Sequence, residues 1–320
     1  MKKIASIDIG ANTARMTILA LEPTLREVAS GRAITRLGEG IDSNKRLLNH
    51  RIEKTLDALR GFLDTCRQHG EMPIYAVATS AVREAANREE FLQRVKEKTN
   101  LDIQVIPWEE EARLTLEGVL WKISGEGKTV LTFDIGGGST EYILSRGKHI
   151  LKAAGTSLGV VRLTEKFISR HPVDPTEYQA LENHLRAELA GVRSRLPDEA
   201  VDLMIGTAGT VTTLAALDKN IYPYDPLKVH GATLQKENIH KILDDLKNRS
   251  LEERLQLKPL ERGREDLIIA GTALVLQTMD TFACKELTVS EYGLREGIIL
   301  KHLAAQKNTE TGLSHFFIEK

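Results

Sequence analysis

Short apolar runs and longer runs with helical spacing alternate along the first 120 residues. Ile52, Leu56, Leu59 and Leu63 recur at the spacing of one helical face and predict a helix over 52–67. Apolar runs bounded by Gly, Pro or Asp predict strands at 3–10, 15–21, 27–37, 74–79 and 102–107. Further helices are expected around 91–95 and over 109–121. This part therefore reads as three strands, then helix, strand, helix, strand and helix.

The same order begins again after the glycine-rich stretch SGEGK at 124–128, which we interpret as a domain boundary. Strands are predicted at 130–135, 141–144, 150–154, 202–205 and 287–290. Helices are predicted near 160–168, 175–195, 235–247, 266–282 and 293–305. A chain of 320 residues fits about two domains. We therefore predict domains at 1–123 and 124–299.

A glycine loop lies between the first two strands of the second domain, in TFDIGGGSTEYIL at 132–144. Consecutive glycines let backbone N–H groups approach a ligand closely, and successive N–H groups form a concave site for anions such as phosphate. The candidate phosphate-binding residues are Gly136, Gly137, Gly138, Ser139 and Thr140. Asp134 and Glu141 offer the oxygen ligands that Mg²⁺ prefers. The alternative is a β-hairpin with an ordinary glycine turn.

A second copy of this pattern lies at 6–19, SIDIGANTARMTIL. Asp8 falls opposite Asp134, and Asn12 and Thr13 fall in the loop. Internal similarity of this kind indicates a repeated architecture. We expect two similar domains that face each other, each presenting a phosphate-binding hairpin to a shared cleft.

A third small-residue turn occurs in GTAGTVTTLAAL at 206–217, where a strand leads directly into a helix. The first turn of a helix binds phosphate through its free N–H groups and its dipole. Thr207, Gly209 and Thr210 are the candidates there. A glycine turn with threonine as the helix N-cap is the alternative.

Composition narrows the class of protein. Hydrophobic residues make up 41% and charged residues 28%, which fits a globular chain. The net charge of −1 gives no bulk electrostatic reason to expect DNA binding. Cys66 and Cys284 provide neither a disulfide framework nor a metal cluster, so we expect a cytoplasmic location. No apolar run approaches the ~20 residues of a membrane span, so no membrane association is expected.

Six motifs in order resemble the exopolyphosphatase / guanosine pentaphosphate phosphohydrolase family and together extend from residue 4 to 299. They are DIGAN (8–12), ATSAVREA (78–85), EEEARL (109–114), DIGGGSTE (134–141), SLGVVRL (157–163) and GLREG (293–297). The resemblance implies the α/β fold of actin and the sugar kinases, with two ribonuclease H-like domains, mixed sheets flanked by helices and an interdomain active site. It also implies a homodimer, and a helix at about 300–320 that packs back on the first domain.

The resemblance further implies Mg²⁺-dependent release of terminal phosphate from polyphosphate or guanosine pentaphosphate. The chain departs from the family at Ala11 and Thr13, where serine is usual, and it has no His-Asp dipeptide. It therefore resembles the short, two-domain form.

Family resemblance also assigns the catalytic roles. Helix dipoles alone favour acidic residues at 109–111, but Glu111 matches the position that orients and deprotonates the attacking water. Asp134 and Glu141 are the expected metal ligands, with Asp8 contacting these ligands or reaching the metal through water. Arg83 is expected on phosphate, with an ion pair to Glu84 or a helix carboxylate as the alternative. Arg36, Arg264 and Lys228 are weaker candidates for the far end of the substrate.

Two other functions remain open at this point: a phosphotransferase of the same fold that needs an acceptor, and a non-catalytic sensor of nucleotides. The sequence does not rank polyphosphate against guanosine pentaphosphate. Clefts between two domains of this type close on their ligands, so we expect a hinge near 119–128 and 297–300.

Overall fold

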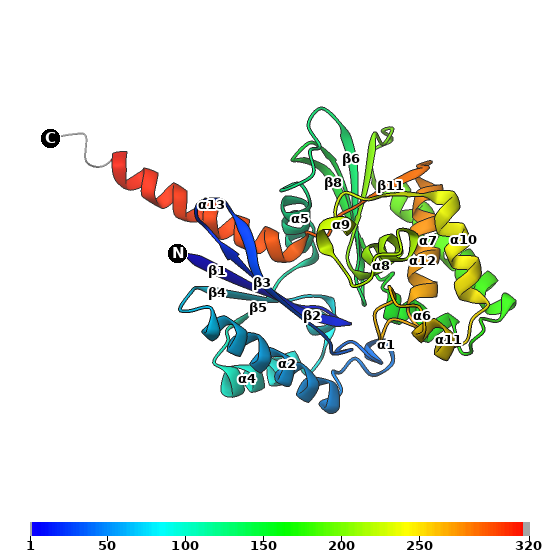
Figure 1. Ribbon diagram of the computed structural model, residues 1–320, viewed down its shortest axis with the longest axis horizontal. Helices are drawn as coiled ribbons and strands as arrows, with labels where there is room; N and C mark the ends of the chain where they lie inside the picture. Colours follow the sequence, from blue (N-terminus) through cyan, green and yellow to red (C-terminus); the bar gives the residue numbers. More distant parts are fainter. Residues whose placement is uncertain (1, 316–320) are drawn as a thin grey trace.

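The computed structural model describes residues 2–315 of the chain, with side chains through residue 306. Two sheets lie side by side, each with its own helices (Figure 1). The first sheet has the order β3-β2-β1-β4-β5, and the second has the order β10-β11-β9-β6-β7-β8. Both contain parallel and antiparallel pairs. The prediction of two mixed sheets flanked by helices is confirmed.

The strands of the first sheet are β1 (Lys3–Ile9), β2 (Thr13–Ala20), β3 (Arg26–Ile34), β4 (Ile74–Ala78) and β5 (Ile103–Val105). Those of the second are β6 (Thr129–Ile135), β7 (Thr140–Arg146), β8 (His149–Thr156), β9 (Leu203–Thr207), β10 (Thr233–Gln235) and β11 (Glu286–Val289). Strands β1 and β6 are central in their sheets and read as near-continuous buried runs. Both faces of a central strand are covered, so alternation of polar and apolar residues is lost there.

The helices of the first half are α1 (Ile41–Asn44), α2 (Asn49–Gln68), α3 (Ser80–Glu84), α4 (Arg88–Thr99) and α5 (Trp108–Val119). Those that follow are α6 (Val160–Phe167), α7 (Pro175–Arg195), α8 (Gly209–Asp218), α9 (Pro226–Val229), α10 (Lys236–Lys247), α11 (Leu251–Leu255), α12 (Ile268–Thr281) and α13 (Leu294–His315). Helix α2 buries the face that its spacing predicted, including Ile52, Leu56 and Leu59. It forms one core with the first sheet, whereas α7 and α12 form a separate core with the second.

The duplicated hairpin is present in both halves with the same register. Asp8 lies opposite Arg15 in the β1–β2 pair, and Asp134 lies opposite Glu141 in the β6–β7 pair. Each loop is closed by one backbone hydrogen bond, which the first glycine donates to the residue three positions later, at 3.1 Å in the first copy and 2.9 Å in the second. The two hairpins, which are similar in sequence, therefore also have similar backbone geometry.

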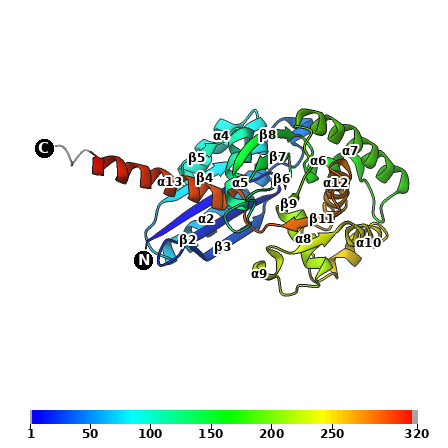
Figure 2. The ribbon, with the colours of Figure 1, turned by 90° about the horizontal axis from the view of Figure 1, so that it is seen from above.

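Helices α5 and α13 cross at the junction of the two halves, and glycines make the crossing possible. A Cβ atom placed on Gly118 would lie 1.8 Å from the carbonyl oxygen of Gly293, and one on Gly297 would lie 1.8 Å from that of Leu114. From this crossing α13 runs back along the first sheet (Figures 1 and 2). It begins at Leu294, one residue after the predicted start at 293, and of the stretch at about 300–320 that was expected to pack on the first domain, residues 316–320 lie outside the described part.

Several short elements were not predicted. Strand β10 and helices α1, α9 and α11 each have three to five residues, too few to display a period. Strand β3 ends at Ile34, before the predicted 37, because residues 35 and 36 donate backbone hydrogen bonds to the Asn12 carbonyl oxygen of the first loop.

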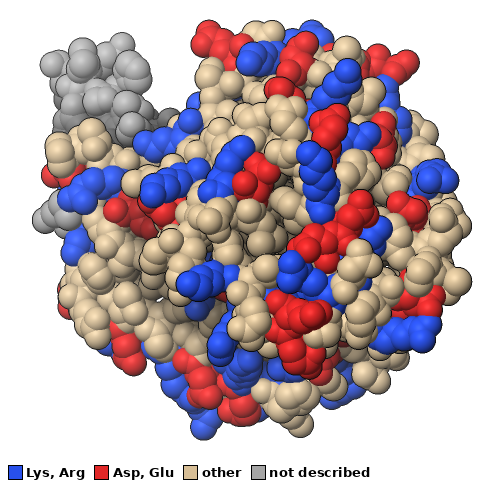
Figure 3. Space-filling model, turned by 45° about the vertical axis from the view of Figure 1, so that its right-hand side comes forward, with Lys and Arg blue, Asp and Glu red and all other residues tan. Residues whose placement is uncertain are grey.

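Charges of both signs are interspersed over the face shown in Figure 3. This agrees with the near-zero net charge of the chain. None of the helices in the described part of the chain has both the length and the apolar character needed to cross a bilayer.

Candidate active site

Both glycine hairpins point into one narrow cleft between the sheets. The space inside this front cleft is about 90 Å³. A Cβ atom on Gly137 would lie 2.8 Å from the backbone nitrogen of Asn12, so the two loops touch directly. Any side chain at position 137 would force the hairpins apart.

Ala11 takes part in this contact. Its side chain is buried, and Cβ atoms placed on Gly38, Gly137 and Gly138 would lie 2.8, 3.2 and 3.3 Å from its own Cβ. The methyl group therefore fills the space between three glycine backbones. The departure from the family's usual serine replaces a hydroxyl with a packing contact between the loops.

The third loop enters the cleft from the end of β9. Arg264 lies across it, because a Cβ atom on Gly209 would be 2.2 Å from the guanidinium carbon. The same guanidinium donates to the Thr13 hydroxyl at 3.3 Å and to Glu261 at 2.7 Å. Arg264 thus joins the third loop to the first hairpin. Ala208 has a positive φ of 73°, a strained conformation for a residue with a Cβ atom.

Asp8 and Asp134 face each other from the two central strands. Poor solvation in the closed cleft raises the pKa of Asp8 to about 7 and that of Asp134 to about 6. Arg15 lowers both pKa values, and the negative charge of Asp134 raises that of Asp8. Both side chains line the cleft, and burial there disfavours their charged forms.

Glu111 lies in the first turn of α5 and is 7% exposed. Its carboxylate accepts a hydrogen bond from Arg83 at 2.9 Å. Burial raises the pKa of Glu111 to about 8, against the opposing effect of Arg83. Burial likewise raises the pKa of Glu141 well above its usual value, and the charge of Glu111 adds to this. The site therefore brings four acidic side chains into a weakly solvated space.

The acidic side chains suit a divalent cation for two reasons: they offer carboxylate oxygens, and two of these oxygens have no hydrogen-bond donor among the described residues. The Oδ1 atom of Asp8 and the Oε1 atom of Glu141 are buried and accept no hydrogen bond from the described residues. Raised pKa values are expected of carboxylates that lack their cation. Within the described side chains, however, no three His, Cys, Asp or Glu residues converge closely enough to form a metal-binding group. A cation here would need water or substrate oxygens to complete its coordination.

The family model of the Ppx/GppA phosphatase family matches residues 17–306 of this chain. The chain belongs to that family. Exopolyphosphatase 2 of Mycobacterium tuberculosis is 29% identical over 94% of this chain and 98% of its own length. A bifunctional 3-dehydroquinate synthase/phosphatase of Fusobacterium nucleatum is 33% identical over 93% of this chain, which spans only 46% of that relative.

Solved structures agree with this assignment. The Ppx/GppA family member from Aquifex aeolicus has a TM-score of 0.80 and 36% identity, covering 95% of this chain and 98% of its own. An exopolyphosphatase from Cytophaga hutchinsonii has a TM-score of 0.89 and 25% identity, with 95% and 98% covered. The predicted family is therefore confirmed.

Most of the predicted site residues of this Ppx/GppA family member line the front cleft. They are Asp8, Asn12, Thr13, Glu111, Asp134, Gly136, Gly137, Ser139, Glu141, Thr207 and Gly209. The roles of these residues in binding Mg²⁺ and phosphate stay predictions, because neither group is part of the structure.

Four predicted phosphate-binding residues do not line this cleft. The Thr140 hydroxyl donates to the carbonyl oxygen of Leu158 at 2.6 Å and is fully buried. Gly138 packs under Ser80, and Thr210 packs against Gly271. Arg83 donates to Glu111, which realises the ion pair with a helix carboxylate that the sequence left as an alternative. The Thr140 hydroxyl and the Arg83 guanidinium are therefore bonded to other parts of the protein.

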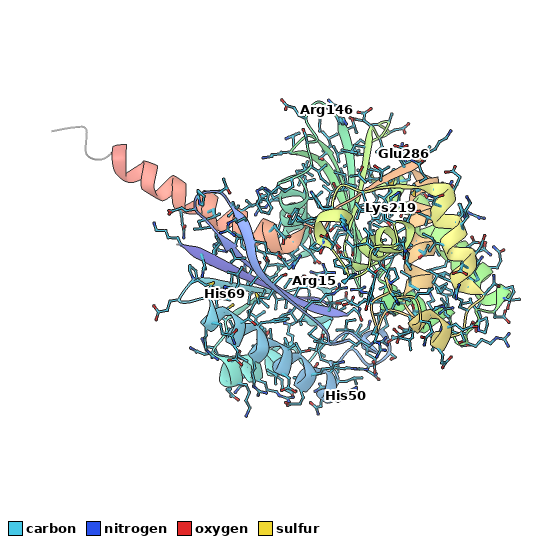
Figure 4. The ribbon with its side chains drawn as sticks, viewed as in Figure 1. Arg15, His50, His69, Arg146, Lys219 and Glu286 are labelled. Carbon is cyan, nitrogen blue, oxygen red and sulfur yellow. The ribbon has the colours of Figure 1, made fainter. Side chains whose placement is uncertain are left out.

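Other residues line the cleft without having been predicted, namely Arg15, Thr79, Ser80, Glu291 and Arg295. Figure 4 shows Arg15 on β2, in the hairpin of the first half. Thr79 and Ser80 follow β4, which pairs with β1 as β9 pairs with β6. They are thus the first-half counterpart of the loop at 207–210, a repeat that could have been found in the sequence. Nothing in the sequence pattern marks Glu291 as facing the cleft.

The weaker candidates have separate outcomes. Arg264 lines the cleft. Arg36 instead makes a bidentate ion pair with Asp266 in the second half, at 2.8 and 2.9 Å. Lys228 is exposed, and its ammonium group lies 3.9 Å from the Asp225 carboxylate. It does not line the cleft.

Proposed function

We propose that this chain is a Mg²⁺-dependent phosphohydrolase that releases orthophosphate from the end of polyphosphate or of guanosine pentaphosphate. The observation that carries the proposal is the position of Glu111, a buried carboxylate facing the meeting point of two glycine hairpins. An exopolyphosphatase among the family relatives supports the substrate class.

In this proposal the backbone N–H groups of the two hairpins hold the terminal phosphate. Hydrolysis of a phosphoanhydride needs an in-line water and neutralisation of negative charge. Glu111 orients the water and accepts its proton, while the new bond forms at the terminal phosphorus and the bridging P–O bond breaks. Arg15 and Arg264 lie on the cleft wall, where they neutralise charge on the shortened chain that leaves.

The metal would be held by Asp8, Asp134 and Glu141, directly or through water. When bound, Mg²⁺ supplies charge neutralisation on the phosphate oxygens and lowers the pKa of the surrounding carboxylates. The two buried oxygens that lack a hydrogen-bond donor support this assignment.

The test is orthophosphate release from polyphosphate and from guanosine pentaphosphate, each with Mg²⁺ and with chelator. We expect release from at least one substrate that requires Mg²⁺ and falls by about 10²–10⁴-fold in Glu111→Gln. The neighbouring Glu110→Gln is the control, because Glu110 pairs with Arg113 and Lys301 on the helix surface.

Two results would contradict the proposal. Phosphate transfer that occurs only with an added acceptor indicates a phosphotransferase. Binding without turnover, equal in wild type and Glu111→Gln, indicates a sensor. We also propose a cytoplasmic homodimer on the family resemblance, and light scattering of the purified chain tests the dimer.

A further inference from the structure

A second hollow, the back hollow, lies behind the phosphate loop of β6 and β7. Its volume is about 820 Å³, far larger than the front cleft. Arg83 and Trp108 form one side, and Gly191 and Arg195 on α7 form another. The reaction as described above uses none of the residues contributed by α7.

The two spaces share a wall. Ser139 and Glu141 line both the front cleft and the back hollow. Glu111 lines only the front cleft and Arg83 only the back hollow, and the 2.9 Å bond between them separates the two. A movement of the Arg83 side chain would therefore connect the space beside Glu111 with the back hollow.

The in-line geometry gives the two ends of the site different roles. The attacking water and the leaving chain lie on opposite sides of the terminal phosphorus. Glu111 marks the water side, next to Arg83 and Glu141. Arg15 and Asp8 face each other across the first hairpin and line only the front cleft, so we expect the leaving chain to extend toward the front. Orthophosphate therefore forms on the water side. As long as the shortened chain stays bound in the front cleft, it blocks the exit at the front.

We propose that the back hollow is the path by which orthophosphate leaves while the shortened chain remains bound. The inference rests on the proposed hydrolase function. Arg83 and Arg195 are the groups on this path that can contact an anion, although Glu141 and Glu188 also line it. Arg195 donates to the backbone oxygens of Gly155 and Gly191, at 3.3 and 3.2 Å, and among the described residues it forms no ion pair with a carboxylate. Glu84, also in the wall, is neutralised by Arg162 at 2.5 Å.

The chain offers a clean way to fill the hollow. Gly191 lies on the exposed side of α7, and a Cβ atom there would meet no atom within 4 Å. Gly191→Trp therefore adds a large side chain at the lining of the hollow from a Cβ position with open surroundings, and it replaces a residue unfavourable to helices. Ala187→Trp, one turn earlier and also in the lining, is an independent second plug. Gly61→Trp on α2 is the matched control, since Gly61 is an exposed helical glycine with equally open surroundings in the other half.

The experiment compares two rates for each variant with a polyphosphate of defined length. Rapid quenching measures all orthophosphate formed, and a phosphate-binding fluorescent sensor measures only what has been released. We expect both plugs to slow release by about tenfold or more while the first turnover stays fast, so that orthophosphate accumulates on the enzyme. Gly61→Trp should match wild type in both rates.

Three results overturn the inference. Release from the plugged variants at the rate of Gly61→Trp shows that orthophosphate leaves by another route. A raised KM together with a slowed first turnover shows that the hollow admits the substrate chain. Absence of orthophosphate from the wild type overturns the hydrolase function as well, which distinguishes that failure from the other two.

Discussion

The guanidinium of Arg83 donates to the carboxylate of Glu111 at 2.9 Å, and the same nitrogen donates to the carbonyl oxygen of Ile106 at 2.9 Å. Arg83 is thereby tied to the end of β5 and holds Glu111 from the side away from the front cleft. An arginine first expected on phosphate instead contacts the proposed base in this structure.

The first prediction concerns the pH dependence of that base. Burial raises the pKa of Glu111 to about 8, and Arg83 opposes the rise. A base works only when deprotonated. Loss of the Arg83 guanidinium, which lowers the pKa of Glu111, should therefore move the rising limb of the kcat/KM profile to higher pH. We expect this shift in Arg83→Met and a smaller one in Arg83→Lys, measured by orthophosphate release between pH 6 and 10 at saturating Mg²⁺, a range of about two units around the raised pKa. An equal loss of activity at every pH would contradict this role of Arg83.

The second prediction concerns stability without metal. Asp8 has a folded-state pKa of about 7 against about 3.9 for an unfolded aspartate. Between these values the folded state binds more protons than the unfolded state, so the free energy of unfolding falls as pH rises. Asp8→Asn removes this dependence. With chelator present, we expect the variant to gain stability relative to wild type as pH rises from about 5 to 8.

Urea unfolding of both proteins at the two pH values measures this difference. Added Mg²⁺ should restore the stability of wild type at the higher pH and leave Asp8→Asn unchanged, because a ligand stabilises only the state that binds it. A stability difference that does not vary with pH would show that Asp8 is ionised in the folded state.

The third prediction concerns closure of the cleft. The Arg36–Asp266 pair joins the two halves, and both side chains are about three-quarters buried, with 26% and 23% exposed. Arg36→Ala should weaken the closed arrangement, which small-angle scattering would detect as a larger radius of gyration. Arg94→Ala is the control, because Arg94 pairs with Glu53 within the first half. Equal radii in Arg36→Ala and wild type would show that other contacts hold the halves together.

The fourth prediction concerns the crossing of α5 and α13. Gly297→Ala introduces a methyl group 1.8 Å from a backbone oxygen that cannot move without shifting α5. Overpacking of this kind costs about 1–3 kcal/mol, so the free energy of unfolding should fall by at least that amount. Gly61→Ala on the exposed face of α2 should instead be neutral or stabilising. Chemical denaturation of both variants gives the comparison.

Local features of this protein could be predicted because they are written in adjacent residues. The β1–β2 and β6–β7 hairpins were visible as a repeat, since their glycines and acidic residues recur at one spacing. The same holds for α2 and for the strand-to-helix turn at Thr207. Failures fall on short elements such as β10 and on hydroxyl groups such as that of Thr140, whose partner Leu158 is 18 positions away.

By itself, the sequence determined the fold class, because periodicity and loop composition act over a few neighbouring residues. Its motifs also indicated the family and most of the acidic and glycine residues that meet in the cleft. Only the tertiary structure decided which groups remain free for chemistry. Arg83 forms an ion pair with Glu111, and Arg36 forms one with Asp266. Arg264 packs against Gly209 and donates a hydrogen bond to Thr13. A side chain's partner depends on which distant segments pack beside it, and burial of that partner in turn sets the pKa on which the proposed reaction depends.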